Sequence, residues 1–279
     1  MFQNDLLAGK HVLVTGGGSG LGKSMVKRFL ELGAEVTILG RRENVLQETV
    51  QEFESLGSIF YQTCDVKNPE QVTEVLNTIE QRRPIDALVN NAAGNFISPT
   101  QMLSHRAVDA VLGIVLHGTF YCTLEMGKRW IARKSGGVVL NIATTYAQSG
   151  SGYVVPSAVA KAGVVTLTKS LAAEWGKYGI RLNAVAPGPF PTEGAWERLL
   201  PSEEFGEKLK SRVPLRRYGE HIELANLASF LLSDLSGFIT GDLIHIDGGE
   251  SVWNAGEFNI LDELSAQDWM KMAESRKKG

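Results

Sequence analysis

The segment His11-Val-Leu-Val-Thr15-Gly16-Gly-Gly-Ser-Gly20-Leu-Gly22 sets the architecture of the whole chain. A short apolar run breaks into a glycine-rich turn, and a helical pattern of apolar residues begins at Met25. Strand, glycine turn and helix in this order place backbone N–H groups and a helix N-terminus where a pyrophosphate can bind. A flexible turn is the alternative, but the flanking elements favour nucleotide binding. The predicted cofactor contacts in this segment are Gly16, Gly18, Ser19, Gly20, Leu21 and Gly22.

The next predicted strand, Ala34–Leu39, indicates which dinucleotide is bound. A cofactor with a free 2′-hydroxyl usually meets an acidic residue about 20 residues past the glycines. Here the strand runs into Gly40-Arg41-Arg42, and a guanidinium suits a 2′-phosphate. Arginines that only solvate a helix start would oppose the helix dipole unless an anion is present. The sequence therefore predicts NADPH, held at Arg41 and Arg42.

Apolar strands alternate with helical patterns along the rest of the chain. This alternation predicts an α/β fold, a doubly wound Rossmann-type parallel sheet of about seven strands with helices on both faces. We expect one domain over residues 1–279, with a substrate lid at about 188–218 and a C-terminal arm at 250–279. The later strands are predicted at Ser58–Thr63, Ile85–Val89, Gly137–Ile142, Arg181–Ala186 and Leu243–Asp247.

Composition excludes several classes of function. Of 279 residues, 43% are hydrophobic and 21% charged, and the net charge of −3 gives no reason to expect nucleic acid or an anionic membrane as partner. Cys64, Cys122 and five scattered histidines lack ligand spacing, so no metal is predicted. The first ten residues lack signal-peptide features, and no apolar run approaches the roughly 18 residues that span a bilayer. We expect a cytoplasmic protein.

A second segment, Asn141 to Lys161, carries the candidate chemistry. An apolar strand ends in small hydroxyl residues, a Gly/Ser loop follows, and then a helix that carries a lysine. The pattern resembles the short-chain dehydrogenase/reductase family, whose site is Ser followed by Tyr-x-x-x-Lys, and the turn Thr-Gly-x-x-x-Gly-x-Gly resembles the same family. Lys161 and Thr144 match the lysine and serine positions, but Ser157 stands at the tyrosine position. Another tyrosine, Tyr146, lies eleven residues before Ser157.

Further sequence motifs resemble one particular subgroup of this family. Asn90-Asn-Ala-Ala-Gly94 resembles the family's turn beside the cofactor, and Asn95-Phe-Ile-Ser-Pro99, with Tyr146 and Ser157, resembles the 2,4-dienoyl-CoA reductases, particularly the mitochondrial type. This implies NADPH-dependent reduction of a 2,4-dienoyl-CoA to an enoyl-CoA in unsaturated fatty acid β-oxidation, by a homotetramer. It also implies further cofactor contacts at Asp65, Asn91, Gly94, Lys161, Pro187, Gly188, Phe190 and Thr192, and acyl-CoA contacts at Phe96, Ser104, Tyr146 and Arg198. Asp65 could instead be a plain cap of its turn, and Arg198 a solvated charge.

The chemistry of dienoyl thioester reduction agrees with a tyrosine at position 146 and a serine at position 157. Serine is far too weak an acid to protonate an alkoxide, whereas reduction of a dienoyl thioester mainly needs hydrogen-bond donors aimed at a dienolate oxygen. The resemblance gives that role to Tyr146 and Asn95, and leaves Lys161 to hold the ribose. Most family members carry a relay asparagine where this chain has Val115. The alternatives are an ordinary alcohol or carbonyl (3-ketoacyl) dehydrogenase that uses Tyr153 or Tyr146, and a non-catalytic NADPH-binding protein.

Two peripheral segments complete the expectations. Residues Glu193–Val213 are polar, aromatic and irregular, which suits a lid. Ser265 and Asp268 precede an apolar pattern typical of a capped amphipathic helix. The arm that carries this helix covers the core or, alternatively, forms an interface or channel wall.

Overall fold

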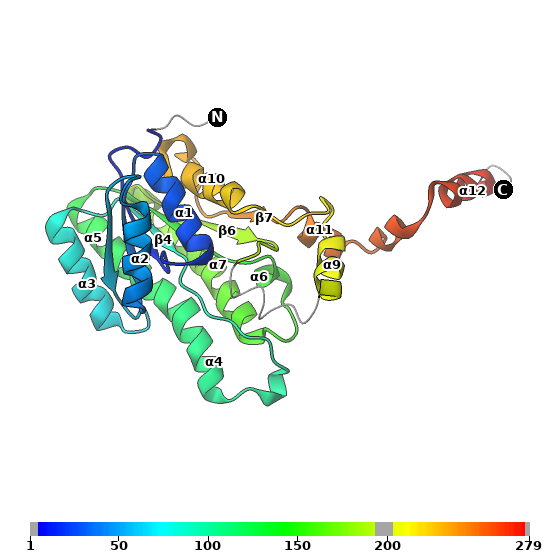
Figure 1. Ribbon diagram of the computed structural model, residues 1–279, viewed down its shortest axis with the longest axis horizontal. Helices are drawn as coiled ribbons and strands as arrows, with labels where there is room; N and C mark the ends of the chain where they lie inside the picture. Colours follow the sequence, from blue (N-terminus) through cyan, green and yellow to red (C-terminus); the bar gives the residue numbers. More distant parts are fainter. Residues whose placement is uncertain (1–4, 193–202, 277–279) are drawn as a thin grey trace.

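The computed structural model describes residues 5–192 and 203–276, and its centre is one parallel sheet (Figure 1). The strand order is β3-β2-β1-β4-β5-β6-β7, and every neighbouring pair is parallel. The predicted fold class is confirmed. The strands are β1 His11–Thr15, β2 Glu35–Gly40, β3 Ile59–Thr63, β4 Ala87–Asn90, β5 Gly137–Ile142, β6 Ile180–Pro187 and β7 Leu243–Ile246.

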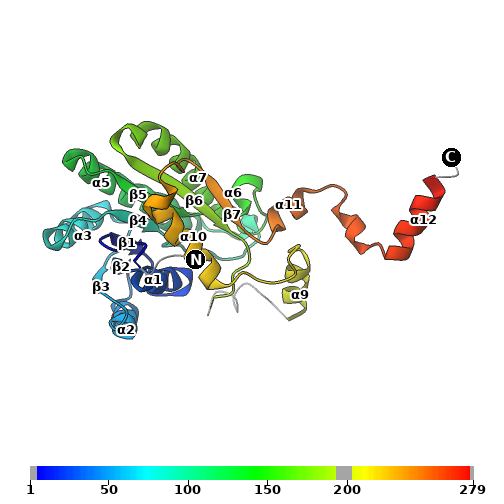
Figure 2. The same cartoon turned by 90° about the horizontal axis from the view of Figure 1, so that it is seen from above.

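Helices cover both faces of the sheet, as Figure 2 shows from above. One face packs against α1 (Gly20–Glu31), α2 (Glu43–Phe53) and α10 (His221–Leu232). The other packs against α3 (Pro69–Arg82), α5 (Gly118–Arg133) and α7 (Val155–Trp175). All residues of β1 and β4 are buried, which explains why these central strands read as continuous apolar runs rather than alternating ones.

The expected helix from Ser104 to Lys134 is one continuous helical stretch with an irregular middle. Helix α4 (His105–Leu112) passes into a π-helical turn, η2 (Gly113–His117), and then into α5. By length and composition alone, this stretch from His105 to Arg133 is long and apolar enough to cross a bilayer. It packs on α7 and on the sheet through buried residues such as Met126 and Trp130, as a core helix does.

The peripheral segments differ from expectation in two ways. The lid region was expected to be irregular, but its described part contains helix α9 (Glu203–Ser211), which a Glu204–Lys208 ion pair one turn apart supports. The arm extends away from the body in Figures 1 and 2, so the interpretation that it covers the core is wrong. Its predicted capped helix is present. The arm elements are α11 Glu250–Ala255, η5 Asn259–Glu263 and α12 Ala266–Arg276.

The body of the protein also contains four short helical elements. They are η1 Thr100–Met102, α6 Tyr146–Ser149, η3 Gly176–Tyr178 and η4 Asp234–Ser236.

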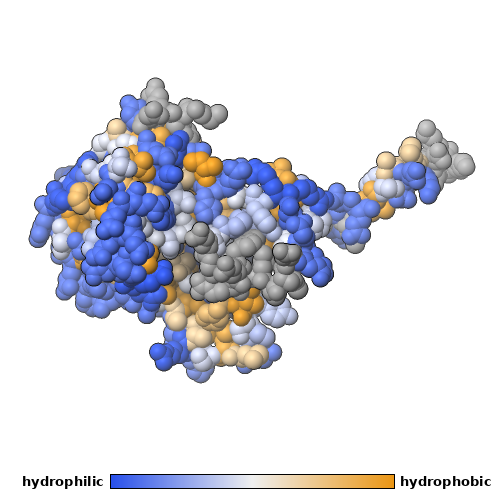
Figure 3. Space-filling view, in the orientation of Figure 1, coloured by the Kyte–Doolittle hydropathy of each residue, from blue (hydrophilic) through white to orange (hydrophobic). Residues whose placement is uncertain are grey.

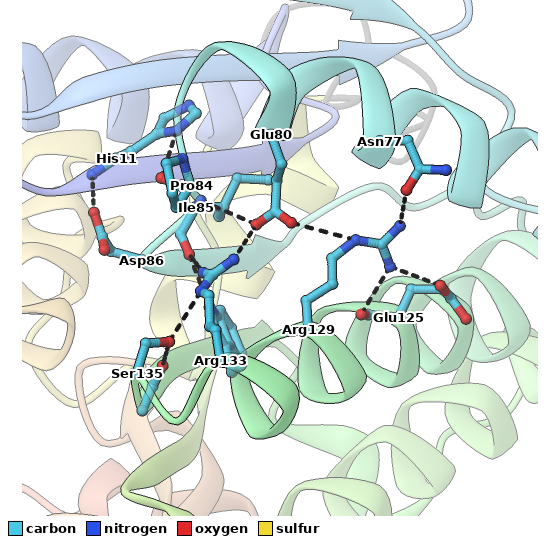
Figure 4. Close-up of polar contacts among 12 residues, drawn as sticks. His11, Asn77, Glu80, Pro84, Ile85, Asp86, Glu125, Arg129, Arg133 and Ser135 are labelled. Atoms are coloured by element: carbon cyan, nitrogen blue, oxygen red, sulfur yellow. Dashed lines mark hydrogen bonds and ion pairs between the residues drawn. The ribbon is translucent and has the colours of Figure 1, made fainter.

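A polar cluster fastens α3 to α5 at the amino ends of the strands (Figure 4). Arg129 donates hydrogen bonds to Glu125 and to Asn77, each at 2.7 Å. Arg133 forms an ion pair with Glu80 at 2.6 Å and donates to the carbonyl of Ile85. Ligands of parallel α/β sheets bind at the opposite, carboxyl edge. We therefore assign this cluster to stability rather than to the site.

The packing of α5 on α7 gives a test of the core. A Cβ added at Gly127 would lie 2.4 Å from the buried Trp175 ring, so Gly127→Ala should destabilise the fold by about 1–3 kcal/mol. Gly176 has open space around its Cα and a right-handed helical φ of −52°, so Gly176→Ala should be neutral or stabilising by up to about 1 kcal/mol. Urea unfolding of the two variants measures the difference, and equal stabilities would contradict this packing.

Candidate active site

A cavity of about 850 Å³ opens along the carboxyl edge of the sheet. Its walls come from the glycine turn after β1, the ends of β2, β4, β5 and β6, and the first turns of α7. The cavity therefore gathers residues that are far apart in sequence, including most of the predicted ones. Those that line it are Gly16, Gly18, Ser19, Gly20, Leu21, Arg41, Arg42, Asp65, Asn91, Gly94, Asn95, Phe96, Thr144, Tyr146, Ser157, Lys161, Pro187, Gly188, Phe190 and Thr192.

The glycine turn is shaped by a close approach inside it. A Cβ at Gly22 would lie 2.3 Å from the carbonyl oxygen of Gly16 and 2.5 Å from Nδ2 of Asn91, so only glycine fits. Gly22 does not line the cavity itself but lets α1 start tightly beneath the turn. At Ser19, the N-cap of α1, no side chain accepts from the first backbone N–H groups. The turn thus offers donors and a helix N-terminus to an anion, and fits a dinucleotide pyrophosphate.

Asn91 has a task that the sequence did not reveal. Its Nδ2 donates to the carbonyls of Thr15 and Gly16, each at 3.1 Å. In return, Thr15 Oγ1 accepts from the backbone N–H groups of Asn91 and Ala92 at 3.0 Å. Asn91 therefore fastens the glycine turn to the end of β4. The only signal in the sequence was its place beside a glycine-rich turn, and that did not distinguish this role from a direct cofactor contact.

The end of β2 presents two cations to the cavity. Arg41 and Arg42 are exposed, and neither guanidinium group has a hydrogen-bond or ion-pair partner among the described residues. Across from them, Asp65 accepts from the backbone N–H of Lys67 at 3.1 Å, as a turn cap does, while it also lines the cavity. Guanidinium groups without a protein partner at the wall of this cavity fit a phosphate.

Tyr146 and Ser157 are brought together from different elements. Tyr146 begins the short helix α6 directly after β5, and Ser157 lies in the first turn of α7. The Tyr146 hydroxyl lies 3.2 Å from Ser157 Oγ, and either oxygen can donate. Ser157 is only 3% exposed, so the pair shows one polar edge to the cavity, formed mainly by the tyrosine hydroxyl.

Lys161 lies one helical turn beyond Ser157 and is 8% exposed. Its Nζ donates to the carbonyl oxygen of Ile142 at the end of β5. Burial lowers the pKa of Lys161 from 10.5 to about 8, and no carboxylate of a described residue offsets that burial. At the expected relay position, Val115 lies buried in the π-helical turn and packs against Ala160, so no polar side chain occupies it.

The segment after β4 carries Asn95 and Phe96 along the cavity wall. Oδ1 of Asn95 accepts from the Phe96 backbone N–H at 2.9 Å, which leaves the NH₂ group as the free end of the amide. The segment is held from the facing loop, where the carbonyl of Tyr153 accepts from the Ser98 N–H at 2.9 Å. Tyr153 has a φ of +64°, a conformation that costs a non-glycine residue about 1 kcal/mol or more. The strained backbone at Tyr153 therefore helps to hold the segment that carries Asn95 and Phe96 in position.

One predicted substrate contact is not brought into this site. Ser104 is exposed and does not line the cavity; its hydroxyl oxygen caps α4 by accepting from the Ala107 N–H at 3.2 Å. That helix-capping use is a sufficient reason for a serine at this position. Arg198 lies outside the described residues.

The chain is similar to a known protein family and to individual members of it over most of its length. Residues 16–251 match the family model described as enoyl-(acyl carrier protein) reductase. A Caenorhabditis elegans protein described as a probable 2,4-dienoyl-CoA reductase, (3E)-enoyl-CoA-producing, is 45% identical over 262 residues, which cover 92% of this chain and 85% of that protein. A Bacillus subtilis protein described as a probable 2,4-dienoyl-CoA reductase, (2E)-enoyl-CoA-producing, is 45% identical over 244 residues, covering 86% and 96%.

A solved structure is similar over the same span. The crystal structure of gluconate 5-dehydrogenase from Burkholderia cenocepacia in complex with NADP and tartrate superimposes with a TM-score of 0.84. It is 31% identical, and the match covers 89% of this chain and 98% of that one.

The depressed pKa of Lys161 predicts a pH effect on stability. Below pH 8 the lysine is charged in both states, and the folded protein bears the full cost of burying that charge. As pH rises through the window from about 8 to 10.5, the unfolded chain binds a proton that the folded one does not, so stability increases. Relative to Lys161→Met, the parent should gain on the order of 2 kcal/mol between pH 8 and pH 10. Unfolding free energies at both pH values test this, and a constant difference would contradict it.

Proposed function

The chain belongs to the short-chain dehydrogenase/reductase family, and from this premise we propose that it reduces 2,4-dienoyl-CoA thioesters to enoyl-CoA with NADPH. One observation carries the proposal: a tyrosine hydroxyl and a free side-chain amide line one cavity, while the position expected to hold the tyrosine acid is Ser157. The two relatives named as dienoyl-CoA reductases support the substrate class.

The reaction places specific demands on these side chains. Bound NADPH supplies a hydride to the δ-carbon of the dienoyl chain. Negative charge then spreads along the conjugated system to the thioester oxygen, and the proton finally goes to carbon. Tyr146 O–H and the Asn95 NH₂ group are the donors that stabilise this dienolate. The loss of one such donor typically costs roughly 3–4 kcal/mol of transition-state stabilisation.

Tyr146 also takes part in the final protonation step. Once charge has returned from the oxygen to carbon, the proton comes from the Tyr146 hydroxyl or from a water molecule that it orders. Ser157, at 3.2 Å, hydrogen-bonds to the phenol and holds its orientation. Thr144 completes the row of hydroxyl groups after β5.

Lys161 acts on the cofactor rather than on the carbonyl. Its ammonium group lies in the cavity beside Ser157 and is suited to hold the nicotinamide ribose. The apolar Val115 supports this division of labour, because a site that does not protonate an alkoxide needs no relay to resupply the lysine. In an ordinary carbonyl reductase the lysine and its relay would have to serve an acidic tyrosine at position 157.

Assembly is part of the same proposal. Phe120 on α5 and Val159 on α7 are apolar and exposed, at 44% and 56%. In Figure 3 apolar surface gathers low in the view, in the region where Figure 1 places α4 and α7. Burial of this surface against another copy would form a twofold interface, consistent with a homotetramer.

The decisive assay compares substrate classes. NADPH oxidation is followed with 2,4-hexadienoyl-CoA beside a panel of ketones and 3-ketoacyl thioesters, and the enoyl-CoA product is identified to assign the double bond as 2E or 3E. Turnover of the dienoyl-CoA alone supports the proposal. A preference for a ketone would overturn it in favour of an ordinary carbonyl reductase.

The displaced tyrosine gives a sharper test of mechanism. Tyr146→Phe should reduce turnover by about a hundredfold or more, with little change in NADPH affinity, because a transition-state donor is lost. Ser157→Ala is the matched control and should be milder. Steady-state kinetics with a dienoyl-CoA measure both. A fully active Tyr146→Phe enzyme together with an inactive Ser157→Ala enzyme would place the acid at Ser157 instead.

Cofactor choice is tested at the end of β2. Arg41→Ala should weaken NADPH binding by about tenfold or more while leaving NADH binding nearly unchanged, because only NADPH carries the 2′-phosphate. Fluorescence titration with each cofactor measures the two dissociation constants. Equal losses for both cofactors would mean that the arginine is structural.

A further inference from the structure

His221 links three segments, α10, α1 and the stretch after β6, and neither the proposed chemistry nor the sequence motifs use it. Its Nε2 lies 2.6 Å from the carbonyl oxygen of Pro191, and its Nδ1 lies 2.7 Å from Ser24 Oγ. A carbonyl can only accept, so Nε2 carries the proton, and in the neutral ring Nδ1 accepts from the Ser24 hydroxyl. Both ring nitrogens are thus engaged, one on helix α1 and one on the segment after β6.

The histidine stands on a rigid base. It is the first residue of α10, where Glu220 and Glu223 form a reciprocal capping box. Helix α10 packs along α1 through fully buried residues such as Leu224. A side chain fixed at this point can hold a neighbour in place at little entropic cost.

The segment it holds needs an external anchor. Pro189 and Pro191 have no N–H, so this stretch can fasten itself mainly through its carbonyl oxygens. The carbonyl of Pro189 accepts from the Gly219 N–H at 3.1 Å, and the carbonyl of Pro191 meets His221. Next in the chain, Thr192 lies over the start of α1, where its methyl group would be 3.5 Å from a Cβ placed on Gly20.

We infer that His221 is a positioning residue that holds the Pro189–Thr192 segment against helix α1, so that Thr192 is in place over the pyrophosphate end of the cofactor site before the dinucleotide binds. The inference rests on the dinucleotide site of the proposed function and not on the identity of the acyl substrate. A segment that is already ordered loses less conformational entropy when the cofactor binds. The hydrogen bond from His221 should therefore strengthen cofactor binding, and its loss should weaken it.

The two ring nitrogens can be tested separately. The side-chain nitrogen of Gln reaches about as far as His Nε2, and that of Asn about as far as His Nδ1. His221→Gln can therefore keep the bond to Pro191, while His221→Asn keeps at most the contact with Ser24. Exposed His105, which begins α4 and does not line the cavity, supplies the control His105→Ala.

The experiment measures NADPH dissociation constants and dissociation rates by NADPH fluorescence on the full chain. Melting temperatures without cofactor are compared to confirm that the variants fold. His221→Ala and His221→Asn should bind NADPH about five- to tenfold more weakly, mainly through faster release, as expected for the loss of one hydrogen bond. His221→Gln and His105→Ala should stay within about twofold of the parent, and kcat at saturating substrates should change little in all four.

Two outcomes would overturn the inference. One is a folded His221→Ala protein that binds NADPH as the parent does. The other is a folded His221→Gln protein as weak as His221→Ala, because the bond to Pro191 would then not be the cause. Since binding is read directly, these results stand even if 2,4-dienoyl-CoA is not the substrate, and failure of the substrate assay leaves them unaffected.

Discussion

The site depends on one constraint, the fastening of the glycine turn after β1 to the end of β4. These strands are neighbours in the sheet although the chain runs from β1 into β2, so the crevice lies where the connections diverge to the two sides. The Asn91 amide closes this junction by donating to Thr15 and Gly16, and the absence of a side chain at Gly22 lets α1 approach from below. A wider junction would move the first turn of α1 away from the strand ends that carry Asn95 and Tyr146.

Local signals in the sequence were sufficient for most of the framework. Strands buried on both faces are continuous apolar runs, so they could be predicted to within a few residues. Arg41 and Arg42 directly follow such a strand, so their place at the carboxyl edge followed from the parallel sheet alone.

The remaining features depend on tertiary contacts that no local pattern encodes. Whether Ser104 caps a helix or touches a ligand depends on where α4 begins relative to the cavity, and the structure shows the cap. Asn91 could be assigned to the cofactor wall, but its partners Thr15 and Gly16 become visible only when β1 and β4 are adjacent. The direction of the C-terminal arm was equally inaccessible, since a capped amphipathic pattern states that a face is apolar but not what covers it.

The electrostatics of the site agree with a reaction in which negative charge gathers on a substrate oxygen and the proton is finally added to carbon. Lys161 is buried against the carbonyl of Ile142 with no carboxylate partner among the described residues, and the apolar Val115 occupies the position expected for a relay side chain. The ammonium group is therefore costly to bury, and no polar side chain at position 115 links it to a proton relay. The proposed donors, the hydroxyl of Tyr146 and the side-chain amide of Asn95, line the same cavity and can hydrogen-bond to a substrate oxygen. Stabilisation by neutral dipoles that are already oriented requires no proton transfer at the moment of hydride addition, and this is the condition that a conjugated thioester sets.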